Sequence, residues 1–103
     1  MNRAEAVAAL RRALELSQEL VVVAESLDVS EVVRLDAERL RLLKSARHVL
    51  QPLSPADRSM LRAIADLNAR SIGRMEHRFR AKCRDMDMLA AGRRAVRAYA
   101  HHR

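Results

Sequence analysis

The stretch "ESLDVSEVV" at residues 25–33 decides the fold, because it interrupts an otherwise long helical pattern. Asp28 is followed three residues later by Glu31, which is the spacing of a capping box at the start of a helix. Ser30 is an alternative N-cap residue. One helix is therefore expected to end near residue 27, and a second is expected to begin near residue 30.

A second break lies in "QPLSPADRSM" at residues 51–60. Ser54 can cap a helix, Pro55 suits the first helical position, and Asp57 places a negative charge near the positive helix end. The two breaks predict helices over residues 3–27, 30–50 and 55–90. A C-terminal helical segment is expected over residues 92–103.

Composition and periodicity both favour helices over strands. The chain of 103 residues is 50% hydrophobic but only 2% aromatic, and it holds two glycines and two prolines. Apolar residues recur at helical spacing and form a broad face on the first predicted helix. We therefore expect a single all-α domain over residues 1–103, an antiparallel bundle of three helices with the C-terminal segment, that is, a three- to four-helix bundle.

The length of the third helix raises a question about the C-terminal end. A helix that ran from Pro55 to the last residue would exceed roughly 70 Å at 1.5 Å per residue, far more than its two partners. Two outcomes stay open. The helix ends near Gly92, where glycine can form a left-handed C-terminal turn, or the overhang meets another molecule.

No pattern in the sequence indicates catalysis. There is no glycine-rich phosphate loop, no GxSxG, no HExxH and no CxxC. His77 lies six residues before Cys83, which is not a same-face helical spacing, so a metal or nucleophile site is not expected there. The sequence thus predicts a non-enzymatic protein without a cofactor. The longest apolar run, Leu20–Ala24, is too short to span a membrane, and a single cysteine fits the cytoplasm.

The charge distribution offers one functional alternative. The net charge of +7 resides entirely in residues 55–103. Arg70, Arg74 and Arg78 recur every four residues and would form a basic face that could contact nucleic-acid phosphates. Acidic residues four positions before Arg70 and Arg80 predict helix ion pairs instead, and stacking aromatics are nearly absent. Nucleic-acid binding is disfavoured and is kept as the alternative.

Surplus apolar residues favour a protein-binding role. Leu20, Val21, Val22 and Val23 are consecutive and span about 300° of a helix, more than a three-helix core can cover. Val22 is the residue least aligned with the apolar stripes, so it is expected to meet a partner, either a client protein or a second copy in a homodimer. The predicted partner contacts are Val22, Met75, Phe79, Met86, Leu89, Val96 and Tyr99.

The stretch "ALELSQELVVVAESLDVSEVVRLDAERLRLLKSAR" at residues 13–47 resembles the first two helices of the FliT-type flagellar export chaperones. The shared features are a long helix, a short break that contains Asp28, and "LDAERLRLLK" with the Glu38–Arg39 dipeptide. The closing "LAAGRRAVRAYA" at residues 89–100 is similar to the end of that family. The related FlgN-type chaperones share much of the same pattern.

The resemblance implies a cytoplasmic helical bundle that holds an amphipathic segment of a flagellar export substrate, such as the filament-cap protein, and that can contact the export apparatus. In FliT-type proteins a C-terminal helix can cover the binding surface. Carried onto this chain, that helix is Gly92–Tyr99, with Val96 and Tyr99 as its apolar face and Arg93, Arg94 and Arg97 pointing outward.

Overall fold

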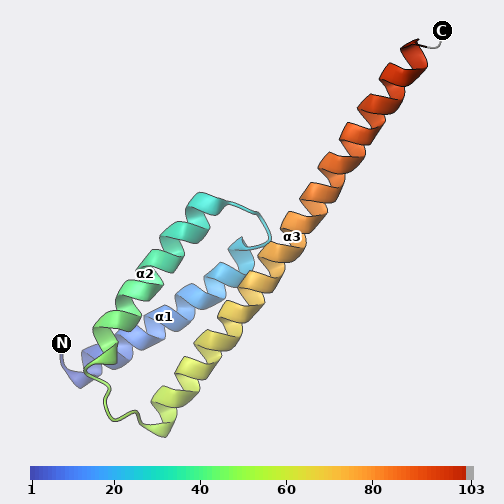
Figure 1. The fold of residues 1–103 in the computed structure, drawn as a ribbon. Coiled ribbons are helices and arrows are strands. Elements are labelled where there is room, and N and C mark those ends of the chain that lie inside the picture. Colours follow the sequence, from blue (N-terminus) through green and yellow to red (C-terminus); the bar gives the residue numbers. More distant parts are fainter. Residues whose placement is uncertain (102–103) are drawn as a thin grey trace.

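The computed structural model describes residues 1–101, which form three α-helices and no strand (Figure 1). The helices are α1 (Arg3–Val23), α2 (Val29–Arg47) and α3 (Pro55–His101). They run up, down and up again, so each is antiparallel to the next along the chain. The predicted all-α bundle of three helices is confirmed.

Side chains cap the N-termini of all three helices. Asn2 and Glu5 form a reciprocal capping box at α1. Asp28 Oδ1 accepts a hydrogen bond from the Glu31 amide at 3.1 Å. Ser54 Oγ accepts from the Asp57 amide, and Asp57 Oδ2 accepts from the Ser54 amide, both at 3.1 Å. The caps predicted at Asp28 and Ser54 are confirmed. Each side chain accepts a hydrogen bond from an amide in the first turn that has no partner within its helix.

The C-terminal ends of α1 and α2 differ from the predicted ends. Helix α1 stops at Val23, four residues before the predicted end. Ser26 Oγ donates to the carbonyl oxygen of Val23 at 2.7 Å, and Leu27 adopts a left-handed φ of 54°, which turns the chain out of the helix. Helix α2 ends at Arg47 rather than at residue 50.

Helix α1 is the centre of the bundle. It packs against both α2 and α3, whereas within residues 1–101 no Cα atom of α2 lies within 8 Å of one in α3. Small buried side chains on α1 let both neighbours approach closely. The buried hydrophobic residues of the core are Ala6, Ala9, Leu10, Ala13, Leu16, Leu20, Val21, Ala24, Leu35, Ala46, Leu50 and Ile64.

Helix α3 extends far beyond the bundle (Figure 1), so the molecule measures 76 × 21 × 17 Å. Its 47 residues pass through Gly92 without a break. Glycine costs only about 1 kcal/mol against alanine within a helix. From Arg84 to His101 every residue is exposed. We call residues 85–101 the overhang.

The predicted C-terminal segment is therefore helical, but it forms the last turns of α3. The expectation that Gly92–Tyr99 covers a binding surface of its own bundle is wrong for this structure, because these residues lead away from the other two helices. The last two residues of the predicted segment, 102 and 103, lie outside the described part. No helix within residues 1–101 combines the length and apolar character that a membrane span requires.

Candidate partner-binding groove

An apolar groove of about 370 Å³ lies between α2 and α3. Both helices pack on α1, and within residues 1–101 their own Cα atoms stay more than 8 Å from each other. Leu20 of α1 contributes to its base. The groove is lined by Leu20, Val32, Asp36, Arg39, Leu40, Asn68, Ser71, Ile72 and Met75. We call this feature the α2–α3 groove.

The walls of the groove carry apolar side chains that the bundle leaves partly uncovered. Leu40 of α2 is 46% exposed and Ile72 of α3 is 44% exposed. Phe79, one helical turn beyond Met75, is 64% exposed, and Met86 follows on the same side of α3. Large apolar side chains that gather in one concave place are typical of a binding surface.

A buried arginine forms the polar part of the groove. Arg39 is only 7% exposed. Its guanidinium donates to Asn68 Oδ1 on α3 at 2.8 Å and to Ser17 Oγ on α1 at 3.4 Å, and it pairs with Asp36 on α2. A buried charge is tolerated when several hydrogen bonds satisfy it. Arg39 therefore joins all three helices and holds the two walls of the groove together.

The predicted partner contacts do not form one site. Met75 lines the α2–α3 groove and is half-buried. The other six are exposed and fall on three further places, namely α3 just beyond Met75 (Phe79), the overhang (Met86, Leu89, Val96, Tyr99) and α1 (Val22). The predicted contacts did not include Leu40 and Ile72, which line the groove.

The predicted basic face of α3 is interrupted. Arg70 and Arg78 are exposed, but Arg74 between them is committed to α1. Arg74 Nη1 donates to the carbonyl oxygen of Val21 at 3.1 Å, and Arg74 Nε lies 3.5 Å from a carboxylate oxygen of Glu25. Arg74 thus satisfies a carbonyl in the last turn of α1, and its guanidinium is paired with groups of α1 and of the turn that follows it.

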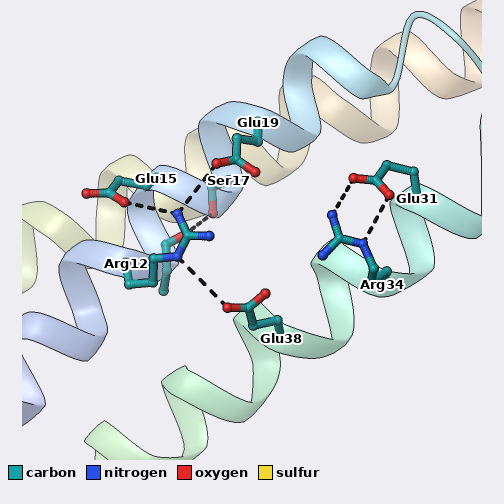
Figure 2. Close-up of polar contacts among 8 residues, drawn as sticks. Arg12, Glu15, Ser17, Glu19, Glu31, Arg34 and Glu38 are labelled. Carbon is teal, nitrogen blue, oxygen red and sulfur yellow. Dashed lines mark hydrogen bonds and ion pairs between the residues drawn. The ribbon is translucent and has the colours of Figure 1, made fainter.

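A polar cluster occupies the surface between α1 and α2 (Figure 2). The Arg12 guanidinium lies 3.1 Å from Glu15, 3.5 Å from Glu19 and 3.9 Å from Glu38 of α2. The hydrogen bond to Glu15, with the other two carboxylates, raises the pKa of Arg12. This surface is built from paired charges, in contrast to the apolar walls of the groove.

A second ion pair lies nearby on α2, where Glu31 accepts two hydrogen bonds from Arg34 (Figure 2). These bonds lower the pKa of Glu31.

The Glu38–Arg39 dipeptide, which forms part of the resemblance to FliT-type chaperones, contacts α1 at two places. Glu38 lies near Arg12, and Arg39 donates a hydrogen bond to Ser17. Its observed role is to hold the bundle together.

Within residues 1–101 no group of three or more histidine, cysteine or acidic side chains could hold a metal ion. Cys83 is a free thiol, partly exposed on α3. Comparison of the chain with protein families, curated proteins and solved structures finds no match.

Proposed function

We propose that the protein is a helix-binding chaperone or adaptor that holds an amphipathic segment of a client protein in the α2–α3 groove. The observation that carries the proposal is the groove between α2 and α3, where Leu40 is 46% exposed and Ile72 is 44% exposed. A surface of this kind fits the apolar face of a helix better than it fits a small polar substrate.

The arrangement of the three helices supports a helical client. With α1 at the centre and α2 and α3 on either side of it, one position of a four-helix bundle is unfilled. A client helix in that position would place residues spaced i, i+3, i+4 and i+7 against Leu40, Ile72 and Met75. Burial of each large apolar side chain contributes roughly 1.5–3 kcal/mol before the cost of ordering the client.

The resemblance of residues 13–47 to FliT-type chaperones suggests the class of client. On that basis we propose a flagellar export substrate such as the filament-cap protein, held in the cytoplasm before export, with the export apparatus as a second partner. The nucleic-acid alternative receives less support, because Arg74 is engaged by Val21 and Glu25.

Calorimetry with a peptide from the amphipathic terminal segment of the native filament-cap protein tests this function. Leu40→Glu and Ile72→Glu each place a charge in the groove, and each should weaken peptide binding at least about tenfold. Val22→Glu is the matched control, because Val22 is an exposed valine on the side of α1 away from Leu20. It should leave the peptide affinity unchanged.

Two results would contradict the proposal. Peptide binding that survives both groove variants would place the client elsewhere. Equal loss in Val22→Glu would move the site to the outer surface of α1. Circular dichroism of each variant establishes that the bundle is intact, as expected for side chains that are already nearly half exposed or more.

A further inference from the structure

The overhang carries an apolar stripe that no other part of residues 1–101 covers. Leu89, Gly92, Val96 and Tyr99 are spaced alternately by three and four residues, so they lie along one face of α3. Met88 adjoins them. Leu89, Val96 and Tyr99 are all exposed by 60% or more. We call these five residues the overhang stripe.

Charges are distributed unequally along the stripe. Asp85 lies on the same face at the end nearer the bundle, whereas Arg93 and Arg97 flank the distal half. The stripe therefore carries one carboxylate, Asp85, at the end nearer the bundle, beside Arg78 and Lys82, and a guanidinium group, Arg97, near its distal end. A partner helix of the same sequence brings Asp85 close to Arg97 only when it runs in the opposite direction.

We propose that the overhang stripe binds the overhang of a second copy of this chain in antiparallel orientation. Two-fold symmetry about Gly92 then places Asp85 of each copy about 3 Å along the helix axis from Arg97 of the other copy, close enough for an ion pair. A parallel pair would instead place Asp85 beside Asp85 and Arg97 beside Arg97, where like charges repel. The overlapping segment from Asp85 to Tyr99 is about 22 Å long at 1.5 Å per residue.

Gly92 supports the antiparallel arrangement. It lies midway between Asp85 and Tyr99, so the two helices cross at or near it. An added Cβ at Gly92 would meet no atom of its own chain within 4 Å, so packing inside a single copy does not require glycine there. Between two copies, the missing side chain permits close approach of the helices at their crossing point.

In this arrangement the end of the second copy's helix would contact the bundle. A pocket of about 370 Å³ lies where the turn between α1 and α2 meets α3, and it is lined by Ser26, Leu27, Arg78, Ala81, Lys82 and Asp85. A second helix that covers the stripe as far as Asp85 brings its Tyr99 to this pocket. The interface thus extends from the overhang onto the body of the molecule. It leaves the α2–α3 groove free.

Sedimentation velocity of the full chain tests the dimer. The wild type should form a dimer with a dissociation constant in the micromolar range, and Leu89→Glu should raise that constant at least about tenfold. Ala98→Glu is the matched control, because helical geometry places Ala98 on the side of α3 away from both the stripe and Arg97. It should leave the dissociation constant unchanged. Both positions are exposed and outside the bundle, so both variants should keep the helical circular-dichroism signal.

Charge reversal tests the orientation. Asp85→Arg alone and Arg97→Glu alone should each weaken the dimer, and the double variant should restore it. Three results would overturn the proposal: a wild type that is monomeric at about 100 µM, a dimer that Leu89→Glu leaves intact, or a double variant that stays dissociated. A client helix that covers the stripe instead would give the first of these results.

Discussion

Arg39 of α2 donates a hydrogen bond to Asn68 Oδ1 of α3 at 2.8 Å, although the Cα atoms of these two helices nowhere lie within 8 Å of each other in residues 1–101. The bond joins the two walls of the α2–α3 groove. Hydrophobic side chains of both helices share a core cluster nearer the α2–α3 connection, where Ala46 and Ile64 are buried. At Arg39 the width of the groove depends on a polar contact.

Asn68→Ala is expected to lower the free energy of unfolding by about 1–2 kcal/mol, because it removes an acceptor from a buried guanidinium. Arg39→Met removes the charge as well, so Asn68→Ala should cost clearly less in the Arg39→Met background than in the wild type. Urea denaturation of the four proteins in this double-mutant cycle measures the difference. Equal costs in both backgrounds would show that the two side chains are not coupled.

Asp57 should make stability sensitive to acid. Its carboxylate is 3% exposed, and the hydrogen bonds with Ser54, together with the Arg3 guanidinium at 2.8 Å, lower the pKa of Asp57. A carboxyl whose pKa is lower in the folded state stabilises that state fully above its ordinary pKa. This contribution is lost as the pH falls through the folded pKa.

Asp57→Asn should therefore flatten the pH dependence of the free energy of unfolding below about pH 5 while it leaves the helix cap largely in place. Urea denaturation at a series of pH values compares the two proteins. The expected signature is a difference in stability that is largest near neutral pH and shrinks on acidification. A constant difference at every pH would contradict the assignment.

The sequence predicts the helix starts better than it predicts which faces become covered. Asp28, Ser54 and Pro55 act locally, so their capping roles can be inferred without knowledge of the rest of the fold. Periodicity identifies Leu40 and Ile72 as members of apolar faces. It does not reveal that α2 and α3 both pack on α1 and leave these two side chains at an open groove.

Gly92 and Arg39 also show that local sequence patterns do not predict tertiary contacts. Glycine ends a helix when tertiary contacts stabilise a turn there. Every residue from Arg84 to His101 is exposed, so nothing stabilises a turn at Gly92 and α3 continues. Arg39 is part of a short motif in the sequence, but its burial depends on Ser17 and Asn68, which are 22 and 29 residues away. Sequence patterns that span only a few residues cannot indicate such distant partners.

Removal of residues 92–103 should distinguish the α2–α3 groove from the overhang stripe, because only the stripe loses residues. The groove is lined by residues no further along the chain than Met75, so the truncated protein should bind the client peptide with unchanged affinity. It loses Val96 and Tyr99 from the overhang stripe, so it should no longer dimerise. Calorimetry and sedimentation on the same sample measure both properties. Tighter peptide binding after truncation would instead indicate that the C-terminal turns can cover the groove.

The two glycines of α3 give a matched pair for the dimer interface. Gly73 and Gly92 both lie inside the helix, and an added Cβ at either one would meet nothing within 4 Å. In a single chain, each glycine-to-alanine change should stabilise α3 by about 0.5–1 kcal/mol. Gly73 lies off the overhang stripe, so Gly73→Ala should leave the dimer unaffected.

Gly92→Ala should behave differently, because its methyl group would lie at the crossing point of two antiparallel helices. It should increase helicity as Gly73→Ala does, yet raise the dissociation constant of the dimer several-fold. Circular dichroism and sedimentation velocity measure the two effects independently. If both alanine variants dimerise as the wild type does, the helices do not approach closely at Gly92, and the crossing point must lie elsewhere along the overhang.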